Sequence, residues 1–93
     1  MIDYIQDPGH GWFKVSIKQL VQLGIADRIS NYSYRRGTWA YLEEDCDASI
    51  FLRAYEAQHG KHADVVEKYS HHEHWIRRLE RIVPKVLDDE IPW

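Results

Sequence analysis

The stretch that decides the fold is IDYIQDPGHGWFKVS, which runs from Ile2 to Ser16. Residues 2–6 and 12–16 are rich in aromatic and β-branched side chains, as β-strands are, and a DPGHG segment separates them. Proline presets the dihedral angle of the first central turn position, and a glycine after it accepts a positive φ, which is typical of a type II turn. The sequence therefore predicts a β-hairpin with Gly9 in the left-handed conformation.

A helix is predicted directly after this hairpin, over residues 17–23. Ser16 can cap its first turn, with Gln19 three residues later as the partner in a capping box. Gly24 suits the left-handed position that ends many helices, and Ile25 can then fold back onto Leu20.

The middle of the chain predicts a second hairpin and a second helix. In NYSYRRGTWAYLEE, aromatic and polar residues alternate on both sides of a predicted loop, Arg35-Arg36-Gly37. The segment ASIFLRAYEAQHG has an apolar stripe at helical spacing, and His59-Gly60 closes it. Asp45 or Asp47 can cap this helix, because short acidic side chains accept hydrogen bonds from the first backbone N–H groups.

The last third predicts a fifth strand, ADVVEKY, and a further helix in SHHEHWIRRLERIVP. Ser70 and Glu73 can form its capping box, and Pro84 ends it. Residues 84–93 are expected to be a surface tail. The fold class is therefore α+β: residues 1–93 form a single small domain with two β-hairpins and two to three helices, in the order ββαββα plus a C-terminal extension.

Composition limits the classes of function. A chain of 93 residues builds one modest core, and its net charge of -3 gives no overall attraction to nucleic acid or to an anionic membrane. The single cysteine, Cys46, excludes an internal disulfide, and no apolar run approaches the length of a membrane span. The start of the chain has no signal-peptide pattern, so we expect a cytoplasmic protein.

Histidines raise the question of a metal site. DPGHG resembles the zinc-binding strand end of the N-acetylmuramoyl-L-alanine amidases, but the further ligands and the catalytic carboxylate of those enzymes have no counterpart here, which favours a plain turn at His10. A second pattern, H-x2-H-x8-H-x2-H, lacks the thiolates that most structural zinc sites use. We expect no metal and no cofactor, and a zinc-dependent hydrolase is the third hypothesis. If a metal binds, the ligands would be His59, His62, His71 and His74.

Arginine and aromatic residues cluster at two places and predict a binding surface. Such residues dominate the energetics of protein interfaces, and they also stack on bases and neutralise phosphates in nucleic-acid complexes. The alternatives are solubilising arginines and aromatic side chains of the core. The predicted contact residues are Arg35, Arg36, Trp39, Tyr41, Trp75, Arg77, Arg78 and Arg81.

Acidic residues gather before the second helix. They favour its positive N-terminal end, or they form a negative surface for a basic partner. No serine pairs with a histidine and an acid, and carboxylates next to Cys46 oppose its thiolate form, so the sequence predicts no catalytic residues and no enzyme. The acidic patch consists of Glu43, Glu44, Asp45 and Asp47.

One resemblance covers residues 4 to 60. DPGHGWFKV, LVQLGIADRISNYSYRRGTWAYLEEDCDASIFLRAY and the later WIRRLERI resemble a family of small uncharacterised proteins from bacteriophages, prophages and plasmids, which share DPGHGW, a GIAD-IS-YSY stretch and YLEEDCD. That family has no established activity. The resemblance implies an accessory protein in the bacterial host cytoplasm that binds a host or defence protein, with or without inhibiting it, as anti-CRISPR proteins do. A small nucleic-acid-binding accessory protein is the alternative, and the oligomeric state is left open.

Overall fold

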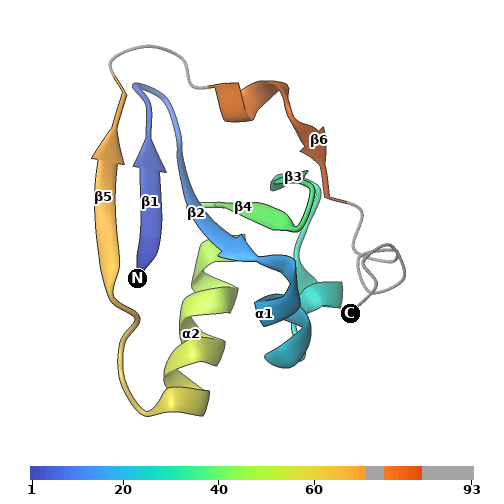
Figure 1. Cartoon of the computed structure of the whole chain (residues 1–93), viewed down its shortest axis with the longest axis vertical. Helices are drawn as coiled ribbons and strands as arrows, with labels where there is room; N and C mark the ends of the chain where they lie inside the picture. Colours follow the sequence, from blue (N-terminus) through green and yellow to red (C-terminus); the bar gives the residue numbers. More distant parts are fainter. Residues whose placement is uncertain (71–74, 83–93) are drawn as a thin grey trace.

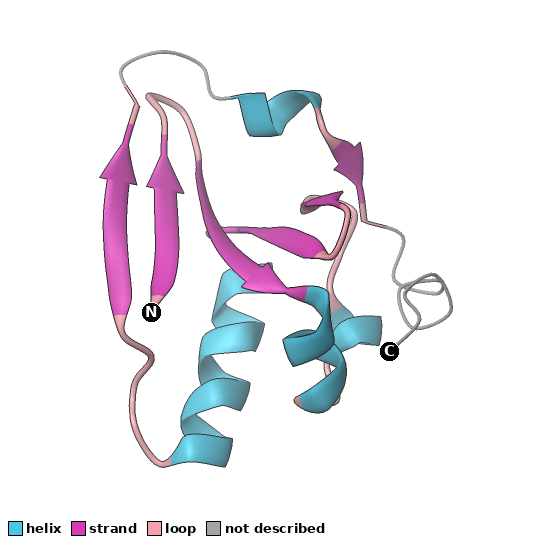
Figure 2. Cartoon of the chain, in the orientation of Figure 1, coloured by secondary structure: helices cyan, strands magenta, loops and turns pink. Residues whose placement is uncertain are grey.

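In the part of the chain that the structure describes, six strands form one mixed sheet, with the two α-helices on the same side of it (Figure 1, Figure 2). The computed structural model describes residues 1–70 and 75–82. The strand order is β5-β1-β2-β4-β3-β6. This arrangement confirms the predicted α+β class. The elements are β1 (Ile2–Gln6), β2 (Gly11–Ser16), α1 (Ile17–Gln22), η1 (Ala26–Arg28), β3 (Tyr34–Arg36), β4 (Trp39–Glu43), α2 (Asp47–His59), β5 (Val65–Tyr69), η2 (Trp75–Arg78) and β6 (Glu80–Arg81).

The first hairpin is confirmed, but its turn is of another kind than predicted. β1 and β2 pair antiparallel, and the Asp7 N–H donates to the His10 carbonyl at 2.9 Å. The Asp7 carboxylate also accepts from the backbone N–H groups of Gly9, at 3.1 Å, and His10, at 2.9 Å. Positive φ angles in the described chain occur at Gly24, Gly37 and Gly60, so the type II turn with a left-handed Gly9 is wrong. The aspartate side chain holds this turn instead, as in an Asx-turn.

The helix after the hairpin forms as its capping residues predict. The Ser16 hydroxyl accepts from the Gln19 N–H at 3.1 Å. Gly24 has a φ of 72°, and the Ile25 N–H donates to the Leu20 carbonyl at 3.0 Å. These are the contacts of a Schellman motif, and they direct the chain back under the sheet.

The connection of the second hairpin begins two residues later than predicted. Arg35 and Arg36 belong to β3, where they pair with Ala40 and Trp39, and Gly37, with a φ of 59°, occupies the turn. The predicted three-residue loop is therefore wrong. A two-residue connection suffices because its glycine supplies the positive φ that tight hairpins require.

Glu43 caps α2, rather than Asp45 or Asp47. Its carboxylate accepts from the N–H groups of Asp45, at 2.9 Å, Cys46, and Asp47, at 2.7 Å. The longer glutamate reaches forward from the end of β4 to the donors that begin the helix. The predicted end is confirmed, because Gly60 closes the helix with a φ of 70°.

Asp47 lies in the interior, with 1% of its surface exposed. Its carboxylate accepts from the N–H of Ser30 at 3.0 Å, from the Ser30 hydroxyl at 2.8 Å and from the hydroxyl of Ser33. These bonds fix the segment between η1 and β3 to the start of α2. A buried carboxylate with this many donors holds two segments together.

The end of the chain differs most from the prediction. β5 is confirmed and pairs parallel with β1, but η2 is a short 3-10 helix, and residues 80–81 form a strand beside β3. The predicted longer helix is wrong because the edge of β3 offers hydrogen bonds: the Ile82 N–H donates to the Ser33 carbonyl at 2.9 Å. Glu73 and the predicted tail at 84–93 lie outside the described residues.

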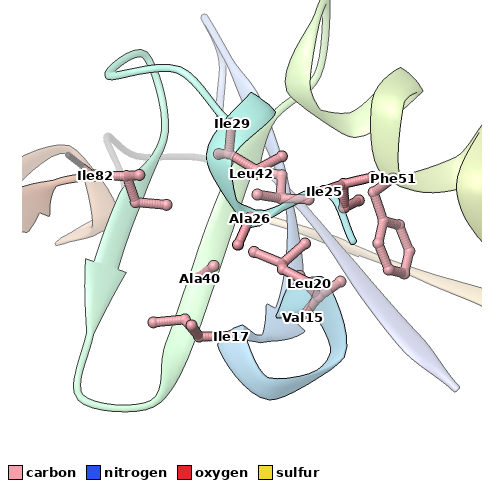
Figure 3. Close-up of a cluster of buried hydrophobic side chains, with 10 residues drawn as sticks. All are labelled: Val15, Ile17, Leu20, Ile25, Ala26, Ile29, Ala40, Leu42, Phe51 and Ile82. Carbon is pink, nitrogen blue, oxygen red and sulfur yellow. The ribbon is translucent and has the colours of Figure 1, made fainter. Parts of the chain in front are cut away.

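Buried side chains lie on both faces of the sheet. The larger cluster fills the space between the sheet and the two helices (Figure 3). A smaller one, made by Ile5, Trp12, Tyr41 and Ile76, lies on the opposite face beneath η2. Within residues 1–70 and 75–82, neither helix has the length and apolar character needed to cross a membrane. The larger cluster consists of Val15, Ile17, Leu20, Ile25, Ala26, Ile29, Ala40, Leu42, Phe51 and Ile82.

Candidate functional site

The sheet face opposite the helices carries most of the charged and aromatic side chains that were predicted to bind a partner and that the structure describes. Cross-strand partners point to the same side of a sheet, so the register defines this face row by row. We call it the open face, and η2 packs onto its middle through Ile76. Its rows are Ile5, Trp12 and Glu43; Asp3, Lys14, Tyr41, Tyr34 and Arg81; and Ser16, Trp39 and Arg36.

Two tryptophans on the open face are exposed and held by cations. Trp39 is 44% exposed, and the Lys14 ammonium lies 4.5 Å from the centre of its ring. Trp75 is 40% exposed, and the Arg36 guanidinium lies 5.6 Å from its ring. Arg36 is also the cross-strand partner of Trp39, so the four side chains are contiguous. We call Lys14, Arg36, Trp39 and Trp75 the platform.

Tyr41 supports the platform from below. It is only 3% exposed, and its ring meets that of Trp75 edge to face at 5.6 Å. Burial raises the pKa of the Tyr41 hydroxyl, while the charge of Arg36 lowers it in part. The prediction that Tyr41 is an exposed contact residue is therefore wrong, because the chain folds Trp75 over it.

A small hollow adjoins the platform. It has a volume of about 170 Å³ and lies between β1, β2, β4, β5 and Trp75. The Lys68 ammonium and the Asp3 carboxylate form an ion pair of 3.1 Å at this hollow. Its lining residues are Asp3, Ile5, Lys14, Tyr41, Lys68, Tyr69, Ser70 and Trp75.

A larger hollow, of about 550 Å³, also opens on this side of the sheet. The His10 ring lies nearly parallel to the Trp12 ring, with the centres 6.0 Å apart and the planes at 13°. The Arg81 guanidinium lies 5.0 Å from the Tyr34 ring and donates to the Asn31 carbonyl at 2.9 Å. The lining residues are His10, Trp12, Tyr32, Tyr34, Glu43, Asp45, Cys46, Arg77 and Arg81.

An ion pair joins the DPGHG turn to η2, which lies on the open face. Arg77 donates from Nε and Nη2 to the two Asp7 carboxylate oxygens, at 2.8 and 2.7 Å, and the Asp7 side chain is fully buried. Gly9 lets the guanidinium approach, since a Cβ there would lie 2.8 Å from Arg77 Nη2. A bidentate pair of this kind fixes the orientation of both groups. We call this Asp7–Arg77 ion pair the clamp. The clamp has a structural role, because it binds Arg77 to another part of the same protein.

The four residues of the predicted acidic patch have different structural roles. Glu43 caps α2, and Glu44 accepts a hydrogen bond from the Tyr4 hydroxyl. Burial, together with the bond to Glu44, raises the pKa of Tyr4 to about 12. Asp47 is buried, so the prediction that it belongs to a surface patch is wrong. Asp45 is exposed at the larger hollow.

The arginines predicted to form one binding surface are separated. Arg35 points to the side opposite its neighbour Arg36 and donates to the Gly37 carbonyl at 3.3 Å. Arg78 is exposed at the last position of η2, and Arg81 lines the larger hollow. Of the predicted contact residues, the structure brings Arg36, Trp39 and Trp75 together in the platform.

Sequence reasoning missed residues that the fold places on the open face. Lys14 and Lys68 belong to strands, and their positions relative to Trp12 and Ile5 follow from strand alternation and pairing. Because alternate residues of a strand lie on the same face, the sequence of β2 alone could have predicted that Lys14 lies on the side of Trp12. Tyr32 lies outside the strands, and no periodic pattern connects it with His10.

The histidines give no support to a metal site in the described chain. The His59 ring packs on Tyr55 at 4.3 Å, and His62 Nδ1 lies 3.3 Å from a Glu56 carboxylate oxygen. His71 and His74 lie outside the described residues. Within residues 1–70 and 75–82, no group of three or more histidine, cysteine, aspartate or glutamate side chains could hold a metal ion.

Comparison with known proteins finds no matching family model, no matching curated protein and no matching solved structure.

Proposed function

We propose that this protein is a non-enzymatic binding protein that contacts a bacterial protein through the platform. The observation that carries the proposal is the pair of exposed indoles, Trp39 and Trp75, each held in place by a cation. Tryptophan and arginine are the residue types that most often dominate the energy of protein interfaces. Tyr41 packs against Trp75, and the strand register sets the side of the sheet on which Trp39 lies. Because both indoles are oriented before binding, they lose little side-chain entropy when a partner binds.

The charges of the open face favour an acidic partner. Three carboxylates on this side already have partners: Asp3 pairs with Lys68, Asp7 pairs with Arg77, and Glu43 caps α2. The cations of the platform contact aromatic rings, which leaves their positive charge available to an incoming carboxylate. The complementary surface would be an apolar patch bordered by aspartate or glutamate side chains.

The resemblance noted in the sequence points to the source of the partner. Accessory proteins of bacteriophages and plasmids act in the cytoplasm of a bacterial host, where host and defence proteins are the available targets. The proposed activity requires no cofactor, since attachment to the target suffices. Inhibition of the target would follow if the platform covers a functional surface of that protein.

Affinity capture from a bacterial lysate, with and without nuclease, tests this proposal. The bait is compared with Trp39→Ala and Arg36→Glu, and with Arg53→Ala as the matched control, because Arg53 is an exposed arginine on α2, on the other side of the sheet. We expect a protein that survives nuclease, is retained by the control and is lost with both platform variants. Equal recovery by all four baits would show that the platform is not the binding surface.

Single-stranded nucleic acid is the second candidate partner. The observation that favours it is the alternation of cations and aromatic rings on one sheet face, because bases stack on rings while cations neutralise phosphates. Fluorescence anisotropy of a labelled 15-nucleotide single strand, titrated at low and at physiological salt, tests this function directly. Steeply salt-dependent binding that Arg36→Glu abolishes would favour it, and no binding at low salt would exclude it.

A further inference from the structure

We propose that the larger hollow is a second binding site, for a guanine nucleotide or for the phosphorylated guanine end of a nucleic-acid strand. The inference is independent of the platform and of the macromolecule that the platform binds. The shared chemistry of the two ligands is a planar, amino-bearing base joined to a phosphate. At about 550 Å³ the hollow lies within the usual range of small-molecule sites.

Aromatic rings supply surfaces on which a base can stack. Tyr32 is 65% exposed, although its ring belongs to a folded segment that Asp47 fixes through Ser30 and Ser33. Tyr34 is half-buried beside it, and His10 covers Trp12. Exposed rings on a fixed backbone are typical of sites that stack planar ligands, since every base has a π-face.

The hollow carries charges of opposite sign at different strands. Arg81 is on β6, at the edge of the sheet, whereas Asp45 follows β4, and β3 lies between these two strands. Neighbouring strands are about 4.8 Å apart, so β4 and β6 are separated by about 10 Å. A ligand that spans this distance meets a cation at one end and a carboxylate at the other.

This polarity selects the ligand and its orientation. A phosphate is stabilised next to the Arg81 guanidinium and repelled by Asp45. An ionised carboxylate only accepts hydrogen bonds, so Asp45 favours a base edge with two neighbouring N–H donors. Guanine presents N1–H and N2–H side by side, whereas the corresponding edges of adenine, cytosine and uracil have no two adjacent N–H donors. The phosphate of GMP would lie at Arg81, its base against Tyr32, and its amino edge toward Asp45.

Isothermal titration calorimetry with the full chain tests the site. The probes are GMP, AMP, CMP, UMP, guanosine and inorganic phosphate, and 5′-phosphorylated and unphosphorylated oligonucleotides that begin with guanine distinguish the two sources. We expect GMP to bind most tightly of the mononucleotides. Tighter binding of the phosphorylated oligonucleotide than of GMP would assign the site to strand ends, and the reverse order to free nucleotides.

Variants separate the three contacts. Tyr32→Ala, at an exposed ring, is expected to weaken GMP binding at least about tenfold through lost stacking. Arg81→Gln should weaken GMP but leave guanosine unchanged, and Asp45→Asn should reduce the preference for GMP over AMP. Arg53→Ala serves as the control. The proposal is overturned if folded protein binds no nucleotide at millimolar concentration, or if Tyr32→Ala and Arg81→Gln bind GMP as the unsubstituted chain does.

Discussion

The two faces of the sheet are built in different ways. The face toward the helices buries hydrophobic side chains from α1, α2 and four other parts of the chain, and none of that cluster is charged. The open face has a smaller cluster of four buried hydrophobic residues and relies on the Asp7–Arg77 pair and on cation–π contacts. Hydrophobic burial is non-directional, whereas ion pairs and ring contacts require fixed geometry. The first face therefore supplies most of the stability, and the second supplies the fixed geometry that the proposed binding surface requires.

The largest expected loss of stability comes from the helix side. Phe51→Ala removes a side chain with no exposed surface from the larger cluster, so we expect the free energy of unfolding to fall by about 4 kcal/mol. Urea denaturation followed by circular dichroism measures this change. Leu52→Ala, at the neighbouring half-buried position on the same helix, is the control and should cost clearly less. A loss below about 1 kcal/mol for Phe51→Ala would contradict the proposed division between the faces.

Arg77→Ala removes the clamp, the Asp7–Arg77 ion pair, from the open face. It leaves the buried Asp7 carboxylate without its cation, which we expect to cost about 3 kcal/mol. Arg78→Ala, at the adjacent exposed residue, should change stability by no more than about 0.5 kcal/mol. The same denaturation experiment compares the two. If both substitutions had equal effects, the pair would contribute no more than a surface charge does.

Gly9→Ala tests how closely the turn and the arginine must approach. The new methyl group would lie 2.8 Å from Arg77 Nη2, so the guanidinium has to shift, at an expected cost of about 1 to 2 kcal/mol. The matched measurement repeats Gly9→Ala in the Arg77→Ala background, where it should be nearly neutral. Equal costs in the two backgrounds would show that the glycine serves the turn alone.

The smallest effect concerns Tyr4, which belongs to neither buried cluster. Its pKa rises from 10.0 to about 12 on folding, mainly through burial and then through the bond to Glu44. A group whose pKa is raised in the folded state stabilises the fold below its unfolded pKa and loses that contribution as pH rises through the folded pKa. Unfolding measured from pH 9 to pH 12 should therefore show a larger loss of stability for the unsubstituted chain than for Tyr4→Phe, which keeps the contribution of Tyr41. Parallel curves for the two proteins would contradict this.

Local chemistry predicted the parts of the fold that local contacts determine. The first hairpin, α1 with its Ser16 cap and Gly24 end, and the close of α2 at Gly60 all depend on residues within a few positions of one another. The role of Gly9 was not predictable, because it comes from the close approach of Arg77, which lies far away in the sequence. β6 was missed for a similar reason, since the hydrogen bonds that stabilise it come from β3.

The candidate site was predictable only in part. Trp39, Arg36 and Trp75 were recognised by residue type. The hairpin pairs Arg36 with Trp39, but Trp75 comes close to them only because η2 packs on the sheet. Tyr41 has the same alternating pattern as Trp39, and the sequence does not show that Trp75 covers it. Residue types thus suggest binding, while the C-terminal segment determines which side chains remain exposed.

The ion pair of the clamp joins residues that are 70 positions apart in the chain. Arg77 follows the end of α2 by eighteen residues, which a ribosome needs about 1 to 4 s to add. During this interval the helices and the strands β1 to β4 have all been synthesised, but the partner of Asp7 is still missing. Trp12 and Tyr41 would remain uncovered on the nascent chain, because Ile76 and Trp75 have not yet emerged. The order of synthesis therefore leaves the aromatic side chains of the open face uncovered on the nascent chain after both α-helices have been synthesised.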